Sequence, residues 1–147
     1  MKNTLATAVI ATAFCAGFAF ADTVPDLRGT WTGSYTAASP GNANNPSPRF
    51  GKAEWQLEIT NQEGNAFYGT SSWRYEGRDW TSYQATGSIR EDGSGLVSIV
   101  ETGEDSPYTV NSVSKGRLDG DKIYVDFQGL ILGTSYSTTL EKQVQSS

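Results

Sequence analysis

The residues best suited to chemistry or ligand binding lie together in "SSWRYEGRDW", from Ser71 to Trp80. This stretch holds two tryptophans, a tyrosine, two arginines and two carboxylates. Aromatic faces stack on planar or sugar-like groups, and a neighbouring charged side chain fixes their orientation through hydrogen bonds. The ligand contacts predicted here are Trp73, Tyr75, Arg78, Asp79 and Trp80.

The same stretch also has a simpler interpretation as a hairpin end without a ligand. Trp73 and Trp80 would then form a cross-strand pair that contributes about 0.2–1 kcal/mol. Arg78 and Asp79 would belong to a solvated turn. The residue types alone leave both interpretations open.

Missing residue types exclude several kinds of catalytic site. The chain has no histidine, and its one cysteine is Cys15. Nucleophile systems that need histidine, and zinc or copper sites of ordinary type, are therefore excluded. We predict no metal, no cofactor and no assigned catalytic residue. The carboxylates left as candidates for an enzyme are Glu76, Asp79, Glu101, Glu104, Asp105 and Asp126.

The first 21 residues are typical of a secretory signal peptide. Lys2 supplies the positive start, an apolar core runs from Leu5 to Phe18, and Ala19-Phe20-Ala21 fits the cleavage pattern. The apolar core is shorter than the roughly 20 residues that span a bilayer, which disfavours a membrane anchor. Bulky Phe14 before Cys15 disfavours a lipid attachment site. We therefore expect export to the periplasm or the cell exterior, with one domain over residues 22–147.

The charge of the chain argues against nucleic acid or an anionic membrane as partner. All 16 acidic residues follow residue 21, and removal of Lys2 leaves ten of the 11 basic ones. Phosphate-binding surfaces are basic, so this acidic domain is not expected to bind them. The expected partner is a small-molecule or glycan-like ligand, or another protein.

The rest of the chain predicts an all-β domain. Short segments rich in Thr, Val, Ile, Tyr and Trp alternate with Gly, Asp and Asn clusters. In "KAEWQLEIT", for example, Ala53, Trp55, Leu57 and Ile59 share one face. The eight predicted strands are Arg28–Thr36, Lys52–Thr60, Ala66–Tyr75, Trp80–Arg90, Gly95–Glu101, Thr109–Leu118, Lys122–Gln128 and Ser135–Lys142.

The connections predict how the strands are arranged. Tight turns, "NQEGN", "EDGSG" and "LDGD", follow the second, fourth and sixth strands, and longer connections follow the odd ones. In an antiparallel up-and-down order, one end therefore carries short turns and the other all the long loops. Eight such strands fit a closed barrel that can hold one small ligand. A two-sheet sandwich is the structural alternative.

The first strand carries a Gly-x-Trp motif, Gly29-Thr30-Trp31, and "GNAFYGTSS" contains a Gly-Thr pair. This pattern resembles calycin-type barrels, such as the avidins and lipocalins. The resemblance implies that Trp31 closes one end of the barrel, with a basic residue, Lys142 or Arg117, against it. Biotin binding is not implied, because Gly33 and Ser71 stand where avidin-like proteins place an Asn and a Tyr. Small periplasmic barrels that inhibit metalloproteases are also similar, but they usually carry a disulfide.

A Pro- and Asn-rich connection, Ala37–Gly51, is expected either to cover the loop-rich end as a lid or to be a surface loop. As a lid it would bring Arg49 and Phe50 to a ligand. Tyr35 of the first strand is a further predicted ligand contact. The predicted function is ligand binding at the loop-rich end. Two alternatives remain: a protein-binding module, such as a protease inhibitor, and a cofactor-free isomerase, cyclase or glycan-active enzyme.

Overall fold

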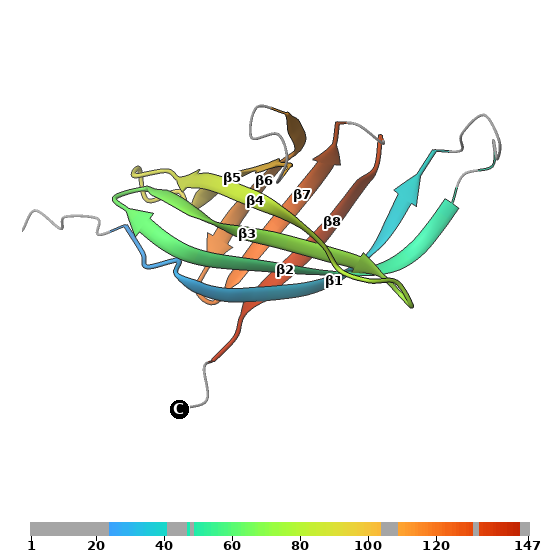
Figure 1. The fold of residues 1–147 in the computed structure, drawn as a ribbon. Helices are drawn as coiled ribbons and strands as arrows, with labels where there is room; N and C mark the ends of the chain where they lie inside the picture. Colours follow the sequence, from blue (N-terminus) through green and yellow to red (C-terminus); the bar gives the residue numbers. More distant parts are fainter. Residues whose placement is uncertain (1–23, 41–46, 48, 104–108, 131–132, 145–147) are drawn as a thin grey trace, which may run out of the picture.

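The chain forms a closed barrel of eight antiparallel strands (Figure 1). The structure is a computed structural model that describes residues 24–40, 47, 49–103, 109–130 and 133–144. The predicted signal peptide lies outside these residues. All eight predicted strands are present, and the all-β barrel prediction is confirmed. The strands are β1 (Gly29–Ser39), β2 (Arg49–Glu63), β3 (Ala66–Tyr75), β4 (Thr81–Ile89), β5 (Leu96–Thr102), β6 (Val110–Asp119), β7 (Lys122–Gly129) and β8 (Ser135–Lys142).

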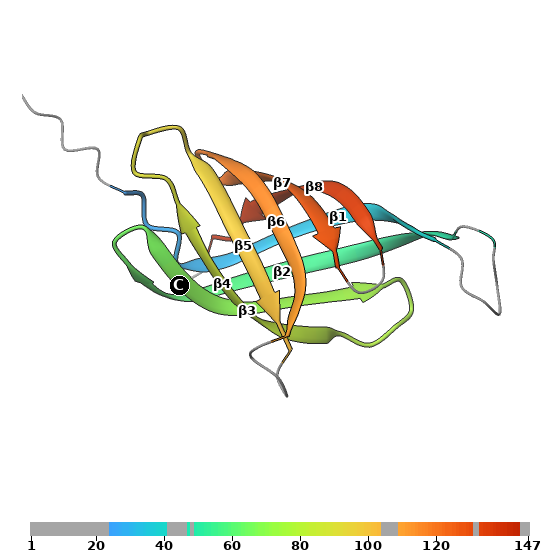
Figure 2. The same ribbon diagram turned by 90° about the horizontal axis from the view of Figure 1, so that it is seen from above.

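Each strand pairs with its neighbours in sequence, and β8 returns to β1 to close the barrel (Figure 2). The closing contact pairs Trp31 with Lys142 and Ala38 with Ser135. Closure leaves the strands without a free edge over most of their length. None of the described residues belongs to a helix that is long and apolar enough to cross a bilayer.

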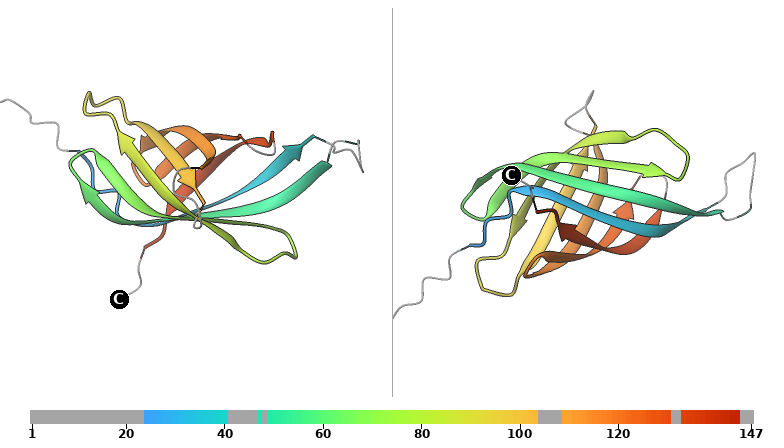
Figure 3. Two further views of the ribbon diagram at one scale, coloured as in Figure 1. Left: turned by 45° about the horizontal axis from the view of Figure 1, so that its top comes forward. Right: turned by 90° about the horizontal axis from the view of Figure 1, so that it is seen from below.

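The two ends of the barrel differ as the connections predicted. The connections β2–β3, β4–β5 and β6–β7 lie together at one end, and β1–β2, β3–β4, β5–β6 and β7–β8 begin at the other (Figure 3). Length separates the two ends only in part, because the β4–β5 connection has six residues and the β3–β4 and β7–β8 connections have five each. Gly64 and Gly120 supply the left-handed backbone of two tight turns, with φ of 56° and 58°. We call the two ends the closed end and the loop-rich end.

Alternating residues fill the barrel interior from the closed end upward. On β2, Trp55 and Leu57 are fully buried, whereas Glu54 before them and Glu58 after them are exposed. Gly69 lies where strands approach closely: an added Cβ would lie 1.9 Å from the Glu58 main-chain oxygen. The sheet therefore needs a residue without a side chain at this position.

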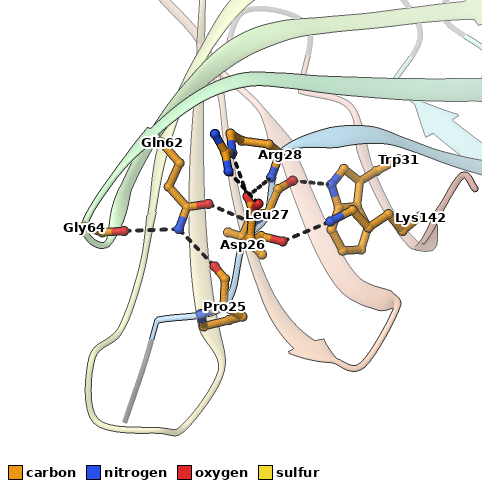
Figure 4. A network of polar contacts seen from close by, with 8 residues as sticks. All are labelled: Pro25, Asp26, Leu27, Arg28, Trp31, Gln62, Gly64 and Lys142. Atoms are coloured by element: carbon orange, nitrogen blue, oxygen red, sulfur yellow. Dashed lines mark hydrogen bonds and ion pairs between the residues drawn. The ribbon is translucent and has the colours of Figure 1, made fainter. Parts of the chain in front are cut away.

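At the closed end, the segment before β1 folds across the barrel (Figure 4). Gln62 holds this segment, because its Oε1 accepts from the Leu27 amide at 2.7 Å and its Nε2 donates to the Pro25 oxygen at 2.9 Å. Leu27, which belongs to this segment, is 1% exposed. This arrangement seals the interior from solvent on that side.

Trp31 lies next to the segment before β1, inside the barrel, and is 1% exposed. Its Nε1 donates to the Leu27 oxygen at 2.8 Å. The Lys142 ammonium lies 5.3 Å from the centre of the Trp31 ring and donates to the main-chain oxygen of Asp26 at 2.9 Å (Figure 4). Of the two basic residues expected near Trp31, Lys142 therefore makes the contact.

At the loop-rich end, β1 and β2 run on past the other strands as a two-stranded ribbon (Figures 1 and 2). The predicted bounds of the loop, Ala37–Gly51, were wrong, because Ala37 pairs with Gly51 and Ala38 with Phe50 in the β1–β2 ladder. Antiparallel pairing continues until Pro40, which has no amide hydrogen to donate. The paired ends of β1 and β2 therefore lie beyond the ends of the other strands (Figure 1).

Candidate functional site: an aromatic cup at the loop-rich end

A cavity of about 180 Å³ lies inside the barrel at the loop-rich end. Six aromatic side chains and the carboxyl group of Glu101 line it. We call the cavity and its lining the aromatic cup. The remaining lining residues are small or polar: Asn111, Ser112, Gly129 and Thr134. The aromatic ones are Tyr35, Trp73, Tyr75, Tyr83, Phe127 and Tyr136.

One wall of the cup comes from β1, β7 and β8 and is a stack of three rings. The Tyr136 ring lies between Tyr35, at 3.6 Å between ring centres, and Phe127, at 4.3 Å. Both contacts are close to parallel, at 13° and 11°. Because each ring is held by its neighbour, this wall, the Tyr136 wall, presents a fixed surface to the cavity.

The other wall comes from β3 and β4. Trp73 stacks on Tyr83 at 6.2 Å and meets Tyr75 edge-on at 5.8 Å. These three side chains are only partly buried, because they lie near the strand ends. We call this set the Trp73 wall. The order of strands in the barrel puts β2 on one side and β5–β6 on the other side between the two walls.

Glu101 is the one carboxylic acid that lines the cup among the described residues, and it is 1% exposed. Its Oε2 accepts a hydrogen bond from the Ser112 hydroxyl at 2.5 Å, and its Oε1 accepts one from the Ser71 hydroxyl. Ser71 in turn accepts from the Trp55 indole nitrogen at 2.6 Å. Three strands besides β5, namely β2, β3 and β6, thus position this carboxyl group.

The direction of these hydrogen bonds matters for the charge of Glu101. An indole nitrogen can only donate, so Ser71 accepts from Trp55 and has its own proton to give to Glu101. Ser112 gives a second proton to the other oxygen. The network therefore supplies donors to a carboxylate, which is an acceptor on both oxygens.

Burial acts in the opposite direction and dominates. It raises the pKa of Glu101 above its usual range, and the bonds from Ser112 and Ser71 offset only part of this effect. No lysine or arginine lines the cup in the part of the chain that the structure describes. Among the described residues, the carboxyl group consequently has no counter-charge in the cavity.

Two tyrosines of the cup, Tyr35 and Tyr136, keep their protons at neutral pH. Burial raises the pKa of Tyr35 to about 12 and also raises the pKa of Tyr136. The Tyr136 hydroxyl oxygen is fully buried, and the neighbouring Tyr35 side chain contributes to its raised pKa.

Of the predicted ligand contacts, the structure brings Trp73, Tyr75 and Tyr35 to the cup. Arg78 and Asp79 are exposed in the β3–β4 connection and do not line it. The carboxylates Glu76 and Asp126 are exposed as well, and Glu104 and Asp105 lie outside the described residues.

Trp80 lies on the outer surface of the barrel. Trp73 pairs with Thr81, so the expected facing pair of tryptophans is not formed. The Trp80 ring instead lies under the Arg74 guanidinium, at 4.6 Å, and Arg74 pairs with Glu54 at 2.6 Å. Trp73 therefore lies on the inner face of the sheet and Trp80 on the outer face.

Of the two residues expected from a lid, the structure describes the side chain of Phe50 alone. Phe50 is 75% exposed on the β1–β2 ribbon and is not among the residues that line the cavity. Arg49 is the first residue of β2, and its side chain lies outside the described part of the structure. Both therefore stay predictions.

The ligand contacts inferred from the sequence did not include Glu101, Tyr83, Phe127 or Tyr136. A signal for Glu101 exists, because Val97 and Ile99 alternate with it and are buried. An acid in the inward phase of a strand is rare enough to mark a site. The Tyr136 signal is weaker, since "SYSTTL" alternates a tyrosine with small polar residues.

Comparisons with known proteins do not place the chain in a family. No protein-family model matches the sequence, and no curated protein is similar to it. Among the described residues, no group of three or more metal-binding side chains comes together. The cup itself is therefore the basis for a functional assignment.

Proposed function

We infer that this protein is an exported, calycin-type barrel that binds a small ligand of about one ring in the aromatic cup. The observation that carries the proposal is the cavity of about 180 Å³ with aromatic walls and a buried carboxyl group. Ligand sites are typically concave and apolar, with a few convergent polar groups. An engineered apolar cavity of about 150 Å³ in another protein holds benzene, which sets the scale of the ligand.

Three features support the calycin type, and a fourth supports export. The Gly-x-Trp motif opens β1, Trp31 lies at the closed end, and Lys142 lies against its ring. The first 21 residues have the composition of a signal peptide. The proposed protein is therefore a periplasmic or extracellular binding protein whose closed end is structural and whose loop-rich end binds.

Tryptophan fluorescence tests the binding function. A library of one-ring compounds is titrated into the purified protein, and emission of Trp73 is expected to change on binding. Trp73→Ala should reduce the affinity for any hit at least tenfold, because it removes the larger part of one wall. Trp80→Ala is the matched control, since it removes a tryptophan seven residues away on the outer face, and should leave the affinity unchanged.

Near-ultraviolet circular dichroism of both variants checks that the fold is intact. If no compound binds, or if Trp80→Ala weakens binding while Trp73→Ala does not, the aromatic cup is not the binding site.

A further inference from the structure

The chemistry of the cup indicates the charge of its ligand. Glu101 is buried and receives hydrogen bonds on both carboxyl oxygens, from Ser71 and Ser112. Such a set of donors serves a carboxylate rather than a neutral acid. A buried carboxylate is costly unless a positive charge accompanies it, and no described lysine or arginine lines the cavity.

The walls favour the same sign of charge. The faces of aromatic rings carry negative potential and attract ammonium groups, most strongly when water is excluded. The chain as a whole has a net charge of −5, which attracts cations to the barrel.

We propose that the aromatic cup selects a small organic cation, an ammonium group attached to one ring, with the ammonium at Glu101 and the ring between the Tyr136 wall and the Trp73 wall. This proposal rests on the proposed binding function and adds the class of ligand. The ligand supplies the positive charge beside Glu101 that no described lysine or arginine supplies. A neutral ring of the same size fills the same space but leaves the carboxylate without a cation.

Proton linkage follows from the same geometry. An ammonium beside Glu101 favours its charged form, so binding of the cation releases the proton that burial retains in the free protein. The affinity for the cation should therefore rise with pH and level off once free Glu101 is ionised.

The other titratable residues of the cup are Tyr35 on β1, Tyr75 on β3, Tyr83 on β4 and Tyr136 on β8. The reference pKa of tyrosine is near 10, and burial raises the pKa of Tyr35, Tyr83 and Tyr136. A pH dependence between pH 5 and 8 would therefore report Glu101.

Three probes of one size separate charge from shape: benzylammonium, benzyl alcohol and benzoate, each titrated by calorimetry at pH 5 to 8. We expect benzylammonium to bind at least tenfold more tightly than benzyl alcohol at pH 8, and benzoate not to bind. Only the benzylammonium Kd should fall as the pH rises. Glu101→Gln should weaken benzylammonium at least tenfold and change benzyl alcohol by less than twofold. Glu58→Gln is the control, because it removes an exposed carboxylate from the outer face of β2.

The outcomes separate the ligand class from the binding function. If the three probes bind equally, or benzyl alcohol binds best, the cationic ligand is refuted while the cup remains a binding site. If none of them binds, the cup takes no ring of this size, and both proposals fail. Should Glu101→Gln not fold, the titration of the unaltered protein is extended down to pH 4, below the usual pKa of a glutamate: a benzylammonium Kd that is flat from pH 4 to 8 refutes the role of Glu101.

Discussion

Replacing Glu101 with Gln should change how stability depends on pH, because the carboxyl group is buried and no described lysine or arginine lines its cavity. Glutamine keeps the size and one acceptor oxygen of the side chain. It loses the titratable proton, while Ser71 and Ser112 keep a polar partner each. The variant therefore isolates the ionisation of Glu101 from the packing of the cup.

The sign follows from the raised pKa. Between the model-peptide value of 4.5 and the higher pKa of the folded state, folded Glu101 holds its proton while the unfolded chain releases it. Stability from this group is full below pH 4.5 and is lost as the pH rises through the folded pKa. The free energy of unfolding should fall by up to about 1.4 kcal/mol per pH unit in that window. Glu101→Gln removes this decline, so the variant gains on the unaltered protein as the pH rises.

Urea denaturation followed by tryptophan fluorescence, at pH 4 to 8 without ligand, measures the effect. The difference in unfolding free energy between Glu101→Gln and the unaltered protein should rise with pH and then level off. Glu58→Gln should give a difference that stays small throughout, because Glu58 is exposed. A difference between Glu101→Gln and the unaltered protein that is constant from pH 4 to 8 would refute the assignment of a buried, unpaired carboxyl group.

Three further predictions concern the rest of the barrel. Trp31→Ala should lower the free energy of unfolding by roughly 3–5 kcal/mol, because it empties the closed end; a loss below about 1 kcal/mol in urea denaturation would contradict its buried position. Gly69→Ala should cost at least roughly 1–3 kcal/mol, because the new Cβ meets the Glu58 oxygen, and an unchanged melting temperature would show that the strands are not this close. Lys142→Met keeps the side-chain length and removes the charge over Trp31; a loss of about 0.5–2 kcal/mol is expected by the same assay, and no loss would show that the ring contact and hydrogen bond contribute nothing.

The barrel could be predicted from the sequence because each strand repeats one local pattern. Alternation in β2 and β7 shows the buried face directly, and Gly-containing turns after every second strand order the two ends. The ends of β1 and β2 could not be predicted, since strand pairing there depends on the partner strand. Ala37 and Gly51 look like loop residues until they pair.

The candidate site could be predicted only where a single strand carries the signal. Trp73 and Tyr75 share a phase with buried Phe67, so alternation alone points them inward. Trp80 directly precedes β4 and has the opposite phase of alternation, so it lies on the outer face. The length of the β3–β4 turn sets this phase. The convergence of Ser71 and Glu101, from β3 and β5, depends on register across β4, which local patterns do not encode.

The most direct test of ligand binding in the cup uses the four tryptophans as position markers. Trp31 lies at the closed end, Trp55 donates to the Glu101 network, Trp73 lines the cavity and Trp80 lies outside. In a ¹H–¹⁵N spectrum each indole N–H gives one signal, which can be assigned by single substitution. On addition of benzylammonium, the signals of Trp73 and Trp55 should shift, while those of Trp31 and Trp80 stay in place. Shifts confined to Trp80 or Trp31, or no shift at all at saturating probe, would contradict ligand binding in the aromatic cup.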